Sequence, residues 1–471
     1  MTATDSGSLD PRRPRGLARP DLIFMILVPL SSVAVLWLGR GLTFFSDEWA
    51  FIADRSLGDP STWWAPHNEH WSTLPILAYR ALVETVGLRT YVPYLALVIV
   101  LNVIVAFLVR RHVQRRAGAW AGLAAGGLVL FLGAGFENLY WGFQIGFVGA
   151  TALGLGALEV LDRPHTAWRA AALVAFLVAG VMTAGVGLFF LAIVAAELLL
   201  RPERRRWIAL LSIPVAIYTL WFIRIGSSGI GVHGDPFSIA AVLRIPEFVI
   251  AGLGEAVGAV TGVGPNLGVV VAIGLLGYAG WRLVRVRALP VRLVAMGAGI
   301  VAQYTLIAVT RAGVGAGQVD YARYTYVAAI LALIGLGSLL GPSLRTIGTR
   351  SRQTRLATLV GAALVLELAA IWNVRLLIEG RQIFVERAEM TRALVTVALA
   401  SDRPAAVDLD RSLVLVPSPN RLEAIVAAYG SPVVDALEPW AVPPIRPEIL
   451  AEAERRLIFG APLPVDEDLT D

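Results

Sequence analysis

The sequence contains no cysteine, and all forty of its basic residues are arginines, so it contains no lysine either. Without lysine the chain has neither the phosphate-binding side chain of a P-loop nor the amine that forms a Schiff base, which excludes ATP-driven motor subunits and lysine-imine enzymes. Without cysteine it has no disulfide, no catalytic thiol and no thiolate metal ligand.

Charge is also scarce, since only 16% of the residues are charged while 56% are hydrophobic and the mean hydropathy is +0.68. These values are typical of integral membrane proteins. Several apolar runs approach or exceed the ~20 residues that a helix needs to cross a ~30 Å hydrocarbon layer. We therefore expect an all-α integral membrane protein with about eleven transmembrane helices. They are placed at 22–42, 92–109, 118–134, 145–161, 169–183, 185–200, 207–225, 266–282, 293–310, 324–341 and 356–373.

Arginine-rich segments all fall on one side of this arrangement, which marks that side as cytoplasmic by the positive-inside rule. They are 110–116, 162–169, 201–207, 282–292 and 345–355. Because these clusters lie beside apolar runs and no separate basic domain is visible, we expect no nucleic-acid partner. The first apolar run is long and no cleavage pattern follows it, so residues 1–21 are expected to form a cytoplasmic tail.

The same topology divides the rest of the chain. Residues 22–373 form the predicted transmembrane domain of a multi-pass protein in the plasma (inner) membrane, and residues 374–471 a small extracytoplasmic C-terminal region. A span at 238–263 would place the segment 282–292 outside, so we expect an interfacial or re-entrant helix there. The MTAGVG sequence at 182–187 predicts a turn between two short spans at the outer face.

The first outer loop, residues 43–90, gathers acidic, histidine and tryptophan side chains directly after the first span. In SDEWAFIADR, Asp47 and Glu48 are expected to begin a short amphipathic helix with Ser46 as its N-cap. Its apolar side chains are expected to face lipid: Trp49, Phe51 and Ile52. A carboxylate at this boundary is partly desolvated, which raises its basicity and suits it to take a proton from a hydroxyl group. Alternatively, the acidic residues only end the span and the tryptophans are interfacial anchors.

A second polar cluster in this loop is HNEHW at 67–71. It supplies four candidate substrate-binding residues: Asn68, Glu69, His70 and Trp71. His67, Glu69 and His70 resemble a metal triad only loosely, because two histidines four residues apart suit one ion better. We assign no metal ligand and no other cofactor, and leave open that a divalent cation assists.

The predicted topology sends three further polar segments to the same face: 136–144, 224–235 and 310–326. They add four candidate substrate-binding residues: Glu137, Arg311, Arg323 and Tyr324. Arginine suits phosphate because its guanidinium group makes paired hydrogen bonds to phosphate oxygens. Alternatively, Arg311 and Arg323 form salt bridges with Asp320 or with the acidic tail.

Two polar residues stand apart from these clusters. Glu367 is the one carboxylate expected in mid-span, where it is either functional or paired with an arginine or a backbone group of a neighbouring helix. His233 lies in a glycine-rich outer segment and receives no role.

This layout resembles the GT-C superfamily of membrane glycosyltransferases, which use polyprenyl-phosphate sugars. The resemblance rests on a first span, the acidic pair of SDEW, a short amphipathic helix and HNEHW before the second span, and it covers roughly residues 20–340. It implies that Asp47 is the catalytic base, with Glu48 as its neighbour or substitute. The implied partners are the lipid bilayer, a polyprenyl-phosphate sugar donor and a cell-envelope glycan, lipid or protein as acceptor, in an inverting transfer at the outer face.

Two other function classes remain open. A lipid-linked glycan flippase or transporter predicts charged residues at mid-membrane depth and a path open to both faces. A scaffold for an envelope-synthesis complex predicts that loss of Asp47 is tolerated. Because the polar residues gather mainly on one side, we prefer the transferase.

Overall fold

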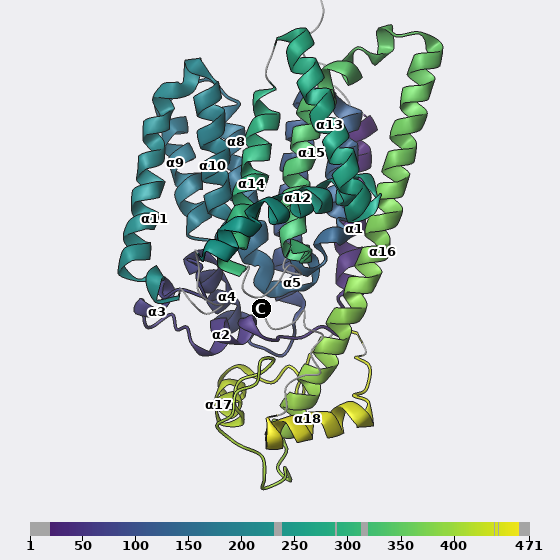
Figure 1. Ribbon diagram of the computed structural model, residues 1–471. Coiled ribbons are helices and arrows are strands. Elements are labelled where there is room, and N and C mark those ends of the chain that lie inside the picture. The colour runs from purple at the N-terminus through teal and green to yellow at the C-terminus, as the bar shows by residue number, and fades with distance from the viewer. Residues whose placement is uncertain are drawn as a thin grey trace, which may run out of the picture.

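The computed structural model describes residues 19–229, 238–287, 290–311, 319–437, 439–440 and 442–460, and the regular structure in these ranges is helical (Figure 1). Eight described helical segments are long and apolar enough to cross a membrane, and three shorter apolar helices accompany them. Together they coincide with the eleven predicted spans. The all-α membrane fold is confirmed, while the number of helices that cross the bilayer remains a prediction.

The helices at the predicted spans form one bundle. They are α1 (Arg19–Leu38), α5 (Val92–Ala117), α6 (Ala119–Leu130), α8 (Ile145–Leu161), α9 (Ala167–Val181), α10 (Val186–Leu200), α11 (Ser212–Arg224), α13 (Gly264–Val286), α14 (Val291–Arg311), α15 (Ala322–Arg345) and α16 (Arg352–Leu399). The α14 helix gives the scale, because Arg292 and Arg311 lie at its two ends. Nineteen residues at 1.5 Å each separate them by ~28 Å, close to the ~30 Å thickness of a hydrocarbon layer.

The bundle therefore has two polar ends. The arginine-rich end carries Arg292 together with η3 (Pro202–Leu211) and η6 (Ile347–Thr349). The loop end carries Arg311 and most of the short elements, and the C-terminal helices are the lowest of these elements in Figure 1. These short elements are α2 (Asp47–Ala53), α3 (Ser61–Trp64), α4 (Thr73–Val86), η1 (Gly133–Gly135), α7 (Glu137–Tyr140), η2 (Gly142–Gln144), η4 (Gly226–Gly229), α17 (Pro419–Tyr429) and α18 (Pro447–Phe459).

The segment expected to lie along the membrane folds as α12 (Ile239–Thr261). Ser238 caps its N-terminus by accepting a hydrogen bond from the Ala241 N–H at 3.1 Å, and Gly262 ends it in the left-handed conformation at φ 77°. In Figure 1 α12 runs across the long helices, and it packs against α13, α14 and α15. It is not among the candidate spans of the described residues. Its depth in the membrane remains a prediction.

The polar side chain of Asn373 fastens α16 to the bundle. It is fully buried, its amide donates to the Ala259 carbonyl at 2.9 Å, and its side-chain oxygen accepts from the Ala134 N–H at 3.0 Å. The backbone beside it must approach very closely, because a Cβ atom built on Gly133 would lie 1.7 Å from the Asn373 carbonyl oxygen. Glycine is required at position 133 for this reason.

Gly133→Ala is therefore expected to destabilise the fold by about 3 kcal/mol, since the clash is with backbone and α16 would have to move. Thermal unfolding in detergent, followed by size-exclusion chromatography, measures this as a lower Tm. The control is Gly274→Ala in α13, where the added Cβ meets nothing within 4 Å. An unchanged Tm for Gly133→Ala would contradict the close approach of η1 and α16.

The first polar loop differs from expectation in two ways. The helix does begin at Asp47, but Ser46 makes no side-chain capping bond; its backbone has φ 53° and its N–H bonds to the Leu415 carbonyl at 3.1 Å. The apolar side chains predicted to face lipid are instead buried in the core: Trp49, Phe51 and Ile52. They are buried because the C-terminal segment and α4 cover α2.

The last long helix runs without a break past the predicted boundary at 373 and ends at Leu399. Its second half is tied to the residues after α1, where Arg381 donates to the Leu38 carbonyl at 2.9 Å and Arg392 donates to the Gly41 carbonyl at 2.5 Å. Glu367 lies on the exposed face of its first half and is paired with none of the described residues, so of the two alternatives the pairing with a neighbouring helix is wrong. The first half of α16 leaves most of its surface uncovered, which is why Glu367 has no neighbour to contact.

Candidate active site

Asp47 is the first residue of α2 and lies at the loop end of the bundle. Its Oδ1 atom lies 3.3 Å from Nε2 of His67, whose side chain is only 7% exposed whereas that of Asp47 is 34% exposed. The His67 ring packs against the rings of Phe51 and Phe143, each with its centroid 5.1 Å away. His67 was not among the predicted site residues, and it fixes the position of the carboxylate that was.

Two opposing effects act on the pKa of Asp47. Burial raises it, but the nearby His67 imidazole and the positive charge of Arg323 outweigh burial and hold the pKa of this carboxyl below its usual value. Asp47 is therefore ionised at neutral pH. The expectation that partial burial would make Asp47 more basic omitted His67 and the guanidinium group of Arg323, which lies far from Asp47 in sequence.

Glu48 has a different environment although it is the next residue. It is fully buried, and its carboxyl group accepts hydrogen bonds from the Phe45 N–H at 3.0 Å, from the Tyr91 hydroxyl at 2.8 Å and from the Tyr79 hydroxyl. Burial raises the pKa of Glu48 to about 8 against the lowering effect of these bonds. Because its oxygens are enclosed and already accept three hydrogen bonds, Glu48 is not available to a substrate and instead fixes the start of α2.

The raised pKa of Glu48 predicts a pH-dependent stability. Between the ordinary value of 4.5 and about 8, the folded protein holds a proton on Glu48 that the unfolded chain has lost, so stability falls as the pH rises through this window. The expected slope is about 1 kcal/mol per pH unit. Tm measured from pH 5 to 8.5 tests this, with Glu48→Gln as the variant that removes the titration. Equal slopes for the variant and the unsubstituted protein would contradict it.

The HNEHW cluster folds into a tight turn. The His67 N–H donates to the His70 carbonyl at 3.0 Å, and the His70 N–H donates to the His67 carbonyl at 2.9 Å. Asn68 adopts φ 50°, a left-handed conformation that asparagine tolerates better than most residues. A Cβ on Gly229 would lie 1.8 Å from the Asn68 carbonyl oxygen, so η4 closes directly over this turn. The turn directs Glu69 toward the long helices.

Glu69 joins this turn to α14. Arg311 Nη2 donates to Glu69 Oε1 at 2.6 Å, and His70 Nε2 lies 3.7 Å from the same oxygen. Burial lowers the pKa of His70, an effect that Glu69 opposes and Arg311 reinforces, so the imidazole is neutral at neutral pH. Arg311 is 5% exposed, and its Nη1 atom is buried without a hydrogen-bond partner among the described residues. Its partner is thus Glu69, whereas the alternative interpretation had expected Asp320 or the tail.

Arg323 approaches the site from the first turn of α15. Its backbone N–H donates to Glu137 Oε2 at 2.9 Å and its Nη1 lies 3.6 Å from Glu137 Oε1. Its guanidinium carbon lies 4.4 Å from the centroid of the Tyr321 ring and 5.2 Å from that of Tyr324. Because its charge lowers the pKa of Asp47, Arg323 and Asp47 belong to one electrostatic site.

Trp71, one of the predicted substrate-binding residues, is a packing residue beside the site. The Trp71 ring is buried, stacks on Trp221 at a centroid distance of 4.9 Å and donates to the Thr73 hydroxyl at 2.7 Å. With its ring covered, Trp71 offers no face to a sugar. Asp47 is joined through His67 to the turn that carries Asn68, Glu69 and His70, and Glu69 joins this turn to Arg311. Glu137, Arg323 and Tyr324 form a second group of contacts, and Glu48 lies apart from both groups.

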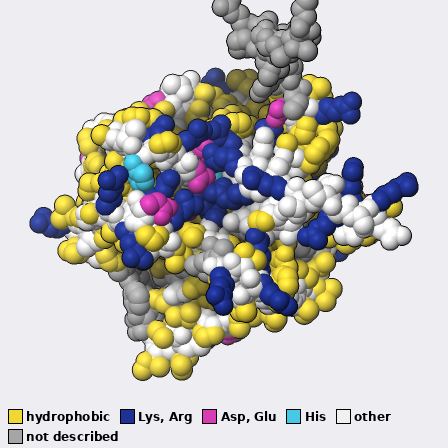
Figure 2. All heavy atoms as spheres, turned by 90° about the horizontal axis from the view of Figure 1, so that it is seen from above, with side chains coloured by type: hydrophobic (Ala, Val, Ile, Leu, Met, Phe, Trp, Pro, Cys, Tyr) yellow, Lys and Arg dark blue, Asp and Glu magenta, His cyan; other side chains and the backbone are white. Residues whose placement is uncertain are grey.

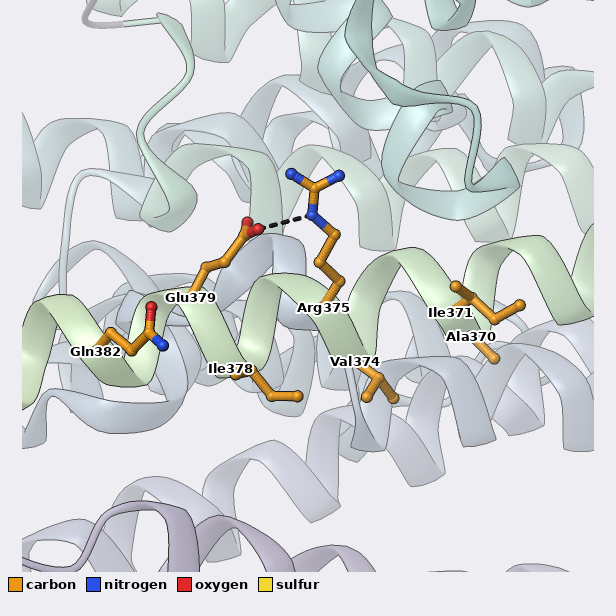
Figure 3. Close-up of a pocket in the computed structure, with 7 residues that line it drawn as sticks. All are labelled: Ala370, Ile371, Val374, Arg375, Ile378, Glu379 and Gln382. Carbon is orange, nitrogen blue, oxygen red and sulfur yellow. Dashed lines mark hydrogen bonds and ion pairs between the residues drawn. The ribbon is translucent and has the colours of Figure 1, made fainter.

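A hollow elsewhere on the surface does not bring together polar side chains from several elements. It has a volume of about 660 Å³ and is lined by one face of α16 (Figure 3). The charged residues that line it, Arg375 and Glu379, pair with each other at 2.6 Å. Since its polar groups come from a single helix and neutralise one another, we do not regard it as a candidate active site.

In the described part of the chain, no group of three or more His, Asp and Glu side chains is arranged to hold a metal ion. The histidines of HNEHW instead lie against one carboxylate each, His67 against Asp47 and His70 against Glu69.

Comparison with known proteins gives a match in fold. No family model and no curated protein matches the sequence. The apo crystal structure of ArnT from Cupriavidus metallidurans matches with a TM-score of 0.51 at 13% identity, covering 88% of this chain and 90% of that chain. The structure of the same protein bound to undecaprenyl phosphate gives 0.49 at 13% identity, covering 87% and 89%. The chain therefore shares the fold of ArnT over most of its length.

Proposed function

We propose that this chain transfers a sugar from a polyprenyl-phosphate donor to a glycan, lipid or protein of the cell envelope, at the outer face of the membrane and with inversion. The observation that carries the proposal is the joint placement, at one end of an ArnT-like fold, of an ionised Asp47 beside His67 and a buried Arg311 whose Nη1 has no partner among the described residues. A base and an anion-binding cation in one site are what displacement of a phosphate by a hydroxyl group requires.

In the proposed reaction, Asp47 takes the proton from an acceptor hydroxyl group. The hydroxyl oxygen forms a bond to the anomeric carbon as the bond from that carbon to the phosphate oxygen breaks, so polyprenyl phosphate leaves with both bonding electrons. His67 is a positioning residue that keeps the Asp47 carboxylate ionised and fixed, at 3.3 Å from its Nε2 atom. No step is assigned to Glu48, because its carboxyl group is enclosed.

Negative charge grows on the departing phosphate as this bond breaks. Arg311 is proposed to bind it, because the buried Nη1 atom has no other partner in the described part of the chain and Glu69 holds the opposite side of the guanidinium group. Arg323, held by Glu137 and Tyr324, is proposed to add a second cation. Glu69, His70 and Asn68 are proposed to orient the sugar. A preorganised cation of this kind acts most strongly in a site from which water is excluded.

The orientation follows from the same proposal. Nucleotide sugars are cytoplasmic, so an outward-facing transferase needs a donor whose phosphate stays at the interface while its isoprenoid lies in the bilayer. We place the loop end, with the C-terminal region, outside the plasma membrane and the arginine-rich end in the cytoplasm. The residues before α1 are then cytoplasmic.

A transfer assay in native-like lipid tests the proposal. The purified protein is given radiolabelled polyprenyl-phosphate sugars and membrane acceptors, and label in the acceptor is measured. Transfer is expected with at least one donor and is expected to be abolished when the donor lacks its isoprenoid chain. If no donor transfers its sugar, but the protein moves lipid-linked sugar between leaflets of a vesicle, the transferase proposal is wrong and the flippase alternative takes its place.

A further inference from the structure

The arginine-rich end holds a charge cluster that the proposed reaction does not use. Its six arginines and three carboxylates are connected by ion pairs, which leaves a net charge of +3. The members are Arg111, Arg115, Arg116, Arg163, Arg201, Arg292, Glu159, Asp162 and Glu197. Figure 2 views this end of the bundle and shows arginine side chains gathered at its centre with acidic side chains between them. An excess of buried and half-buried cations favours an anion at this end.

The charge cluster borders the membrane-facing side at Glu159. Arg111 Nε lies 2.9 Å, Arg115 Nη2 2.5 Å and Arg163 Nη2 3.2 Å from its carboxylate oxygens. Three cations thus share one carboxylate, and the side chains of Arg111 and Arg163 are 39% and 45% exposed. Within the described part of the chain, the Nη atoms of Arg111 have no hydrogen-bond partner, so they remain available to an external acceptor.

An apolar groove of about 620 Å³ begins at the same carboxylate. It runs between α5, α8 and α9, where Leu101, Ala152 and Phe176 line it, and it reaches Thr183 at the loop end. Along α8, Glu159 is fourteen residues from Ile145 at the far end of the groove, which corresponds to ~21 Å. This exceeds half of the ~30 Å hydrocarbon layer, so the groove can hold a hydrocarbon chain through the depth of one leaflet.

At the arginine-rich end, the rim of the groove carries the tryptophan and arginine side chains that are common at the headgroup level of a membrane. Trp168 lines it and is 65% exposed, with the Arg169 guanidinium carbon 5.2 Å from its ring centroid. Tryptophan in this position is typical of the headgroup level of a bilayer. At the other end, by contrast, Leu74, Pro75 and Thr183 line the groove and no charged residue does. A ligand with an anionic head therefore enters from the arginine-rich end.

We infer that this groove and the arginines around Glu159 bind an anionic phospholipid of the leaflet on the arginine-rich side, with its phosphate on Arg111 and Arg163 and an acyl chain between α5, α8 and α9. The inference is independent of the proposed transfer reaction, because these residues lie at the opposite end of the bundle from Asp47. It explains why net positive charge and uncovered apolar surface meet at one place.

Native mass spectrometry of the full chain in detergent tests the inference with phosphatidylglycerol, phosphatidylcholine and inorganic phosphate as probes. Phosphatidylglycerol is expected to bind at least tenfold more tightly than phosphatidylcholine. Arg111→Gln with Arg163→Gln is expected to weaken it about 25-fold, since each cation near an anionic headgroup contributes about fivefold. The control, Arg350→Gln with Arg355→Gln, removes two exposed arginines from the same end and is expected to change binding less than twofold.

A second variant tests the groove separately from the charge. Ala152→Phe fills the groove and is expected to weaken phosphatidylglycerol binding more than tenfold, whereas Ala216→Phe on the exposed face of α11 is expected to have no effect. Equal binding of the two phospholipids would overturn the inference. The inference would also be overturned if inorganic phosphate at the same concentration as the lipid displaced phosphatidylglycerol and Ala152→Phe left binding unchanged. The site would then bind free phosphate. Preferential, Ala152→Phe-sensitive binding of polyprenyl phosphate would assign the groove to an isoprenoid and would overturn it too.

Discussion

Asp47→Asn is expected to lower the rate of sugar transfer by about 10²–10⁴, the usual contribution of a general base. Asparagine keeps the size of the side chain and can still contact His67, so the fold should be preserved while the proton acceptor is lost. Single-turnover transfer from a radiolabelled polyprenyl-phosphate sugar measures the chemical step. Donor binding should change little, because the phosphate is proposed to lie on Arg311 and Arg323.

The neighbouring carboxyl group supplies the matched control. Glu48→Gln removes the carboxyl group one position away, and it should keep the transfer rate within about fivefold because Glu48 is enclosed by Phe45, Tyr79 and Tyr91. Its expected cost is about 1 kcal/mol of stability, since an amide nitrogen cannot accept the Phe45 N–H. Equal rates for Asp47→Asn and the unsubstituted protein would remove Asp47 from the mechanism. A loss confined to Glu48→Gln would assign the base to Glu48 instead.

Arg311→Gln is expected to lower the transfer rate by about 10²–10³, the cost of removing one preorganised donor from a developing anion. The uncharged amide can still donate hydrogen bonds, but it cannot neutralise the phosphate. The measurement is again single-turnover transfer, together with the affinity for polyprenyl phosphate, which should also weaken.

The single variant has a structural side effect, because it leaves the half-buried Glu69 carboxylate without its cation. The double variant Arg311→Gln with Glu69→Gln removes both charges and is expected to recover Tm while its transfer stays as slow as in Arg311→Gln. If the double variant recovers transfer as well as stability, Arg311 only balances Glu69 and does not act on the phosphate.

Much of the fold could be predicted because a membrane helix is recognisable from its own sequence, as an apolar run of about 20 residues. Each of the eleven apolar runs became a helix, including α9 and α10 on either side of the predicted MTAGVG turn. The helix α12 was also expected, because the arginines at 282–292 constrain the topology. What local reasoning did not reveal was the length of α16, whose second half is held by contacts of Arg381 and Arg392 with backbone far away in sequence.

The candidate site was predictable in its members but not in their roles. Asp47 and Glu48 are adjacent and chemically alike, and only the tertiary structure separates an ionised, accessible carboxylate from an enclosed one. The outward orientation expected for Trp49 failed for the same reason, since α4 and the C-terminal segment were not known to cover α2. A histidine near an acidic pair is a weak signal in a sequence, which is why His67 was missed as the partner of Asp47.

The ion-pair partner of Arg311 could not be predicted from the sequence either. Salt bridging of Arg311 with Asp320 or with the acidic tail was the alternative to phosphate binding, but Arg311 pairs with Glu69 on the first loop. Sequence separation gave no guide, because the turn formed by His67 and His70 decides where Glu69 points. Long-range contacts of this kind cannot be inferred from hydropathy or spacing.

A cryo-electron microscopy structure of the full chain with polyprenyl phosphate in lipid nanodiscs would test the account most directly. We expect the phosphate at the loop end, within hydrogen-bonding distance of Arg311 Nη1 and beside the open face of Asp47. A phosphate bound only at the arginine-rich end, or bound at the loop end with Asp47 screened from it by protein, would contradict the proposed site.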